Sequence, residues 1–158
     1  MRALTSMLIL SSFALLVLAG APERARSEAP ATEIAVITHM SVPVSALNAD
    51  ELAAIFRLSR QHWGNGQRIV AFNYAPNTQL RETFDRQVLQ MEPTRISRYW
   101  LDRMIRGESE VPRKVSTPDL MAKVVAKLPG SIGYVPSGSA GKDVRVVARV
   151  VDGRVTAP

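Results

Sequence analysis

The sequence contains no cysteine and only two histidines, His39 and His62, in 158 residues. The lack of cysteine excludes a disulfide framework, a thiolate zinc site, an iron–sulfur cluster and a cysteine nucleophile. Two histidines are too few for a multi-histidine metal centre. No Ser–His–acid set is visible, and the acidic residues stand singly, so we expect a protein that is not an enzyme and holds no metal or cofactor.

Long apolar runs are also scarce, and the one that stands out is Met7–Leu18. Arg2 precedes this run and small residues follow it at positions 19–21, which is the layout of a secretory signal peptide. About twelve apolar residues are fewer than the roughly twenty that a membrane-spanning helix needs. We therefore expect residues 1–29 to be a signal peptide with a flexible lead-in, and an uncleaved membrane anchor is the alternative. Cleavage fits after Ala19, Ala21 or Ala29.

The rest of the chain, residues 30–158, has the composition and length of one globular domain. It holds 17 basic and 12 acidic residues, which gives a net charge of +5. We expect a periplasmic or secreted domain with no stable membrane span after processing. A basic exported domain attracts anionic ligands, lipid headgroups or polyanions, or its charge serves solubility alone. Nucleic acid is not an expected partner, because an exported protein rarely meets it.

Short β-branched segments alternate along this domain with segments whose apolar residues recur at helical spacing. Polar loops are expected at Glu108–Lys114 and Ser137–Gly141. The alternation favours an α/β sandwich with a mainly parallel or mixed sheet flanked by helices. The predicted strands are Glu33–Met40, Arg68–Asn73, Ser131–Val135, Val144–Val151 and, after an Asp152-Gly153 turn, Arg154–Thr156. The predicted helices are Asn48–Leu58, Thr78–Leu89, Pro93–Gly107 and Pro118–Leu128.

Three local features sharpen this prediction. Asn48 and Glu51 have the spacing of a helix-capping box. Trp63 lies in a turn and is expected to plug the end of the sheet. One apolar face is predicted on the third helix, with Trp100 in the core. That face consists of Ile96, Tyr99, Trp100, Met104 and Ile105.

Four motifs, taken in their order along the chain, resemble a known family. They are Leu52-x-x-Ile55-Phe56, Trp63-x-x-Gly66-x-x-Ile69, Asn77-Thr78-x-x-Arg81-Glu82-x-Phe84 and Pro129-Gly130-x-Ile132-Gly133-Tyr134-Val135. This pattern is similar to that of the phosphate-binding proteins of phosphate ABC transporters, over about Ile34–Val135. The resemblance implies a periplasmic-binding-protein-like fold in a short single-lobe form, because full family members have two lobes and about twice this length. It also implies an exported substrate-binding protein for phosphate transport. Such a protein works with an ABC permease, and a second subunit would supply the missing wall.

The candidate site follows from the expected α/β fold. Ligands of such sheets lie at the carboxyl ends of strands, against helix N-termini, and here Asn73–Arg81 turns from a strand directly into a helix. Thr78 is expected to cap that helix and to donate its hydroxyl to an oxyanion. Asn77 and Gln79 would add amide donors, and Arg81 would add a charge-assisted contact. The alternative is that these residues only cap the helix and meet solvent.

Two further candidates, Thr38 and Ser41, lie at the end of the first predicted strand. The resemblance implies that this end faces the same cleft, which makes them secondary ligand-binding candidates. The alternative is that they are ordinary polar residues at a strand end.

The phosphate loop itself departs from the family pattern. The family has an Arg, three further residues, and then Ser-Gly-Thr opening the helix. Those four positions hold Tyr74, Thr78, Gln79 and Leu80 here, so only Thr78 keeps a hydroxyl. Two hypotheses therefore stay open. The first is weak binding of phosphate or another small oxyanion at the helix N-terminus, and the second is an envelope interaction protein that kept the fold and lost its ligand.

Overall fold

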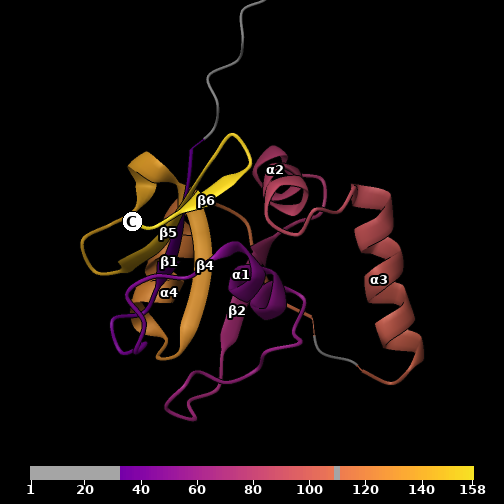
Figure 1. The fold of residues 1–158 in the computed structure, drawn as a ribbon, viewed down its shortest axis with the longest axis horizontal. Coiled ribbons are helices and arrows are strands. Elements are labelled where there is room, and N and C mark those ends of the chain that lie inside the picture. The colour runs from indigo at the N-terminus through magenta and orange to yellow at the C-terminus, as the bar shows by residue number, and fades with distance from the viewer. Residues whose placement is uncertain (1–32, 109–110) are drawn as a thin grey trace, which may run out of the picture.

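The computed structural model describes residues 33–108 and 111–158 (Figure 1). The predicted signal peptide lies outside these residues. They form a six-stranded sheet flanked by four helices and one short 3-10 helix. The strands are β1 (Ile34–Thr38), β2 (Val70–Tyr74), β3 (Arg113–Val115), β4 (Ser131–Pro136), β5 (Arg145–Val151) and β6 (Arg154–Thr156). The helices are α1 (Ala49–Phe56), α2 (Gln79–Gln87), α3 (Pro93–Ile105), α4 (Pro118–Lys127) and the 3-10 helix η1 (Ser137–Ser139).

The sheet is mixed, which confirms the predicted α/β class. Its strand order is β3-β2-β4-β1-β5-β6. β2 pairs in parallel with β3 and with β4, whereas β1 pairs antiparallel with β4 and β5, and β5 pairs antiparallel with β6. One half of the sheet is therefore a parallel unit with helical crossovers, and the other half is antiparallel.

The two faces of the sheet are covered by different helices (Figure 1). A Cβ at Gly133 of β4 would lie 2.4 Å from the Sδ of Met121 in α4, so α4 packs directly on this face and a larger residue there would force the Met121 side chain to move. The next residue, Tyr134, points to the opposite face because side chains alternate along a strand. Its ring stacks on Phe84 of α2 at 3.9 Å between centroids and meets Phe56 of α1 edge-on. The core thus lies on both faces of the sheet.

Several local predictions are confirmed. Asn48 and Glu51 form both bonds of a capping box: Asn48 Oδ1 accepts from the Glu51 amide at 2.9 Å, and Glu51 Oε2 accepts from the Asn48 amide at 3.0 Å. Trp63 is buried, and its Nε1 donates to the Gly130 carbonyl at 2.9 Å. Asp152 and Gly153 turn with φ of 48° and 76°, values that suit a tight hairpin between β5 and β6.

Two predictions about polar segments are wrong. Glu108–Lys114 was expected to be a loop, but its end begins the edge strand β3, which pairs with β2 from Phe72 to Tyr74. This strand is short and mostly exposed, so its sequence has no apolar alternation from which to predict it. Ser137–Ser139, also expected in a loop, forms η1.

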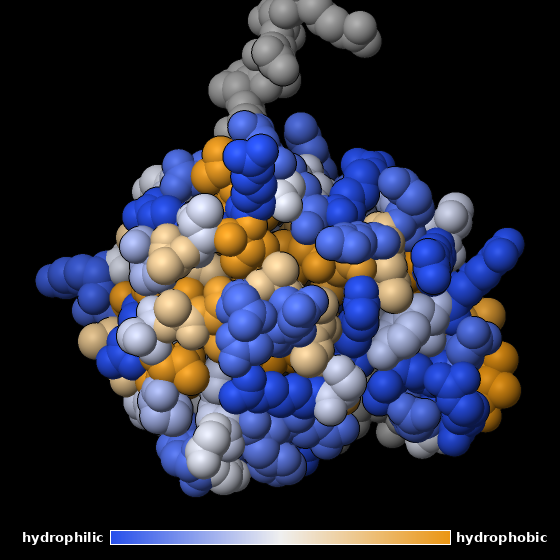
Figure 2. Space-filling model, viewed as in Figure 1, coloured by the Kyte–Doolittle hydropathy of each residue, from blue (hydrophilic) through white to orange (hydrophobic). Residues whose placement is uncertain are grey.

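The predicted apolar face of α3 is only partly buried. Of α3, only Ile96 is fully buried, while Met104 is 62% exposed and Ile105 is 73% exposed. Figure 1 shows α3 beside α2 and projecting away from the sheet. Figure 2 shows apolar surface at the right edge of the molecule, where α3 lies. Helical periodicity places these residues on one face but does not say whether anything packs against it.

Among the residues that the structure describes, no helix is long and apolar enough to cross a membrane.

Candidate functional site

The three parallel strands β2, β3 and β4 end at the same edge of the sheet, and each is followed by a helical element. α2 follows β2 through Ala75–Thr78, α4 follows β3 through Ser116 and Thr117, and η1 follows β4 directly. The carboxyl edge of parallel strands is where α/β proteins place ligands, because helix N-termini gather there. The predicted junction at residues 73–81 lies at this edge.

The first turn of α2 is not capped by a side chain. Thr78 occupies the cap position with extended backbone, but its hydroxyl donates to the Ala75 carbonyl at 3.0 Å and gives the helix no cap bond. The first amides of a helix have no partner within it, so those that open α2 keep their donors for water or a ligand. The side chains of Asn77 and Gln79 beside them are exposed, and Thr78 is half-buried.

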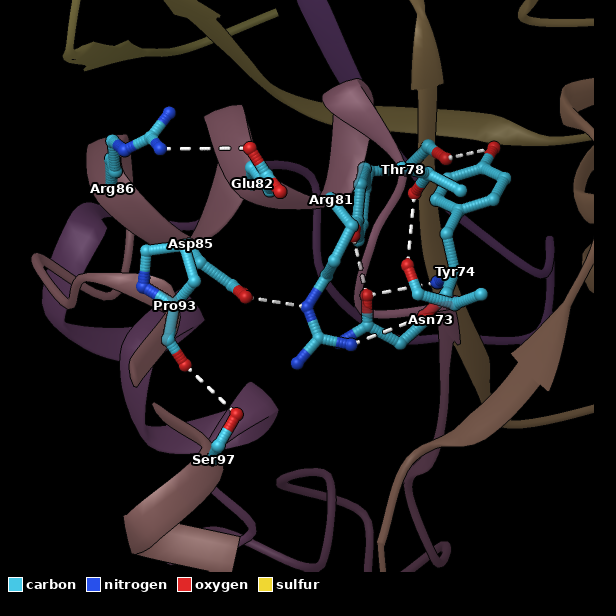
Figure 3. Close-up of polar contacts among 11 residues, drawn as sticks. Asn73, Tyr74, Thr78, Arg81, Glu82, Asp85, Arg86, Pro93 and Ser97 are labelled. Atoms are coloured by element: carbon cyan, nitrogen blue, oxygen red, sulfur yellow. Dashed lines mark hydrogen bonds and ion pairs between the residues drawn. The ribbon is translucent and has the colours of Figure 1, made fainter. Parts of the chain in front are cut away.

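Arg81 is not the open cation that was predicted, nor is it a solvated surface residue. It is only 6% exposed. Its Nε donates to Asp85 Oδ2 at 2.6 Å, and its Nη1 donates to the Tyr74 carbonyl at 3.2 Å (Figure 3). The reason is spacing: Arg81 and Asp85 are four residues apart on the buried side of α2, so they pair with each other. Arg81 therefore ties α2 to the end of β2.

Burial raises the pKa of Asp85, and the nearby Glu82 raises it further. The Arg81 guanidinium opposes this through its charge and its hydrogen bond, and so offsets part of the increase. Asp85 Oδ1 is buried with no hydrogen-bond partner among the described residues. Burying this ion pair costs desolvation free energy, and removal of either partner would leave the other as an uncompensated buried charge.

A buried polar cluster that the sequence did not predict lies beneath this junction. Asn73 Oδ1 accepts from the Tyr74 amide at 2.9 Å and from the Tyr134 hydroxyl, while the Tyr74 hydroxyl donates to the Tyr134 carbonyl at 2.9 Å. Burial raises the pKa of both tyrosines, so both phenols stay protonated at neutral pH. The polar Asn73 ending the apolar run from Ile69 was the one sequence feature that pointed here. The cluster fixes the end of β2 and hence where α2 begins.

Thr38 and Ser41 do not join the other candidates. β1 runs antiparallel to β4, so its carboxyl end lies beside the start of β4 and β2: Thr38 pairs with Ile132, and Ile132 pairs with Ala71. That is the edge opposite to the α2 N-terminus. Thr38 is fully buried, and Ser41 is exposed and hydrogen-bonded to the His39 Nδ1 at 2.8 Å. The expectation that this strand end faces the same cleft is wrong, because β1 runs antiparallel to β4, which is itself parallel to β2.

The described part of the chain holds no group of three or more His, Cys, Asp or Glu side chains arranged to bind a metal. The structure brings together Asn77, Thr78 and Gln79 at an open helix start, with the Arg81 charge buried beneath them. Chemically, such a helix start offers backbone and amide donors and a partial positive charge to a small anion.

No protein-family model matches this sequence, and no curated protein matches it. Solved structures do resemble it. An ABC-type phosphate transport receptor from Vibrio cholerae aligns with a TM-score of 0.57 and 17% identity over 77% of this chain and 51% of its own. A protein from Clostridium perfringens described as a phosphate ABC transporter substrate-binding protein, solved with bound phosphate, aligns with a TM-score of 0.59 and 19% identity over 77% and 45%.

PstS from Borrelia burgdorferi aligns with a TM-score of 0.57 and 15% identity, over 75% of this chain and 48% of its own. The chain therefore spans about half the length of the solved structures that it matches. At this level of identity the likeness concerns the fold. The chain has the periplasmic-binding-protein-like α/β fold of these solved structures, over one part of their length.

Proposed function

We propose that this chain is a non-enzymatic binding module that captures a small oxyanion such as phosphate at the first turn of α2. The observation that carries the proposal is the cap: Thr78 turns its hydroxyl to the Ala75 carbonyl and leaves the first amides of α2 open. The amide side chains of Asn77 and Gln79 are exposed next to them. The fold it shares with phosphate receptors supports the same ligand class.

We expect this binding to be weak. None of the residues from Asn77 to Gln79 is charged, and the nearest cation in the sequence, Arg81, is paired with Asp85. Charge-assisted bonds are the strong ones in anion recognition, so dissociation constants nearer millimolar than micromolar are expected. A second subunit or a permease that closes over the loop would raise the affinity by excluding water. Thr38 and Ser41 lie at the other edge of the sheet and have no part in this site.

The proposal includes a location and a transport role. Residues 1–29 have the layout of a secretory signal peptide, which would place residues 30–158 in the periplasm or outside the cell. There the domain would present its ligand to an ABC permease. Expression of the full chain in a secreting host, followed by N-terminal sequencing of the exported protein, gives the cleavage position directly. Retention of Met1 in the exported protein would contradict the assignment.

The test of the binding site is Thr78→Asp, studied by calorimetric titration with phosphate at low salt and with sulfate for comparison. An Asp at this position places a carboxylate against the open amides, so it should abolish phosphate binding. It should also stabilise the fold by about 0.3–1 kcal/mol. Thr117→Asp is the matched control, because Thr117 already caps α4 by accepting from the Leu120 amide at 3.2 Å. Phosphate binding that survives Thr78→Asp unchanged would place the site elsewhere.

A second candidate function is that of an envelope interaction protein that kept the fold and lost its ligand. The observation that favours it is the exposed apolar end of α3, formed by Leu101, Met104 and Ile105. Gentle crosslinking in the native envelope should then yield a stoichiometric partner with the parent chain and none with Ile105→Glu. Recovery of the same partner with both chains would show that the exposed end of α3 does not bind it.

A further inference from the structure

A pocket of about 210 Å³ lies beside the candidate oxyanion site, between α2, α3 and β3. It is distinct from the candidate oxyanion site, because Asn77, Thr78 and Gln79 do not line it. Six of its eight lining residues come from the α2 and α3 region or from β3. They are Pro76, Arg81, Ile96, Ser97, Trp100 and Lys114.

Two cationic residues line this pocket, Arg81 and Lys114. Arg81 is nine-tenths buried, and two of its nitrogens are committed to Asp85 and to the Tyr74 carbonyl. Its third nitrogen, Nη2, has no acceptor among the residues described, and Figure 3 shows it without a contact. Lys114 pairs through its backbone with Asn73 at the end of β2. Its side chain is exposed and belongs to none of the ion pairs formed within the described ranges.

The charge of the pocket selects the charge of its ligand. Asp85 balances Arg81, so the Lys114 ammonium leaves one uncompensated positive charge. Ser97 adds no donor, because its hydroxyl already donates to the Pro93 carbonyl at 2.9 Å. A monoanion therefore fits better than a neutral molecule or a dianion.

The walls select the rest of the ligand. Ile96 is buried and Trp100 is half-buried. Pro76, Val111 and Pro112 complete the apolar lining. A space of 210 Å³ holds roughly seven waters, which is below the roughly 300–1,000 Å³ of pockets for drug-sized ligands. An inorganic oxyanion has no apolar part to cover these walls, whereas a short-chain or single-ring organic acid does.

We propose that this pocket is a second binding site, which takes a small organic monocarboxylate with its carboxylate between Arg81 Nη2 and Lys114 and its apolar body against Ile96 and Trp100. The site does not depend on oxyanion capture at the first turn of α2. It gives the domain two neighbouring anion sites of different selectivity at one edge of the sheet.

The test is a titration of the full chain with benzoate, followed through the indole N–H signals of its two tryptophans by nitrogen-15 NMR. Trp100→Phe assigns the signals. Benzoate should shift the Trp100 signal saturably and leave that of the buried Trp63 in place. Acetate, which lacks the ring, and benzyl alcohol, which lacks the charge, should each bind at least tenfold more weakly. Equal binding of benzyl alcohol and benzoate, or a shift that does not saturate, would overturn the proposal.

Variants locate the carboxylate without disturbing the core. Lys114→Gln should weaken benzoate binding at least fivefold, because Lys114 is exposed and the substitution removes only its charge. Lys142→Gln, in the loop before β5, removes the same charge elsewhere and should leave the affinity within twofold of the parent. Equal affinities of the two variants would contradict the assignment.

Competition separates this site from the one proposed for phosphate. Excess inorganic phosphate should leave benzoate bound, since the two sites have different donors. Displacement of benzoate by phosphate would place both at the first turn of α2 and overturn the second site. Absence of phosphate binding, with benzoate still bound, would count against the proposed function alone.

Discussion

The N-termini of α1 and α2 carry similar cap residues. They differ in whether the cap side chain accepts a hydrogen bond from a backbone amide of the first turn. In α1, Asn48 and Glu51 close a capping box, so the cap side chain is satisfied within the helix. In α2, Thr78 turns its hydroxyl back to the Ala75 carbonyl, and the third helical residue is Arg81 where α1 has Glu51. No reciprocal bond can form there, because a guanidinium is a donor only.

The difference shows how a helix start becomes available to a ligand. Arg81 turns into the core and holds the start of α2 through Asp85 and the Tyr74 carbonyl. The helix is thereby fixed from beneath, while its first amides have no side-chain acceptor. Within the described residues α1 has no buried ion pair of this kind, and its capping box holds its first turn. A cap residue in a sequence is therefore compatible with a closed helix start, as in α1, and with one whose amides are open to a ligand, as in α2.

The largest test of this comparison removes the anchor. Arg81→Met should lower the free energy of unfolding by about 3–5 kcal/mol, because it leaves Asp85 buried without its partner. Urea unfolding measures this. Arg86→Met is the matched control: Arg86 forms exposed pairs with Glu82 and Glu92, and its loss should cost less than about 1 kcal/mol. Equal costs for the two would show that the buried pair does not anchor α2.

A smaller test compares the two caps. Asn48→Ala should cost about 1 kcal/mol, because it removes a cap bond that α1 uses. Thr78→Ala should change the free energy of unfolding by less than about 0.5 kcal/mol, because the Thr78 hydroxyl donates to an exposed carbonyl that water can also reach. Both values come from urea unfolding under the same conditions. A larger cost for Thr78→Ala than for Asn48→Ala would reverse the comparison.

The smallest expected effect is a pH dependence carried by Asp85. Burial raises its pKa in the folded state, so the folded protein keeps this proton at pH values where the unfolded chain has released it. The contribution of Asp85 to stability is fully present below about pH 4 and is lost as the pH rises through the folded pKa. The effect is limited because Arg81 offsets part of the shift.

The measurement is the difference in unfolding free energy between the parent chain and Asp85→Asn, followed from pH 3 to pH 7. The Asn variant keeps Arg81 buried but has nothing to titrate at this position, so other groups cancel in the difference. The stability of the parent relative to the variant should fall as the pH rises. A rise would mean that Arg81 outweighs burial and lowers the pKa of Asp85.

Much of the fold was predictable because its information is local. The Asn48–Glu51 spacing predicted a capping box that the structure contains, and the Asp152-Gly153 turn predicted the β5–β6 hairpin. β3 and the exposed end of α3 were not predictable in this way. β3 is defined by its backbone pairing with β2, and the fate of Met104 and Ile105 depends on whether another element reaches them.

The candidate site, too, was predictable where its features are local and unpredictable where they depend on distant residues. Sequence alone determined that a strand turns into a helix between Asn73 and Arg81, because strand, turn and cap preferences are properties of neighbouring residues. Only the tertiary structure decided that Arg81 is buried with Asp85, and that Thr38 lies at the opposite edge of the sheet. Strand direction and side-chain burial arise from contacts between residues far apart in the chain, and no local pattern encodes them.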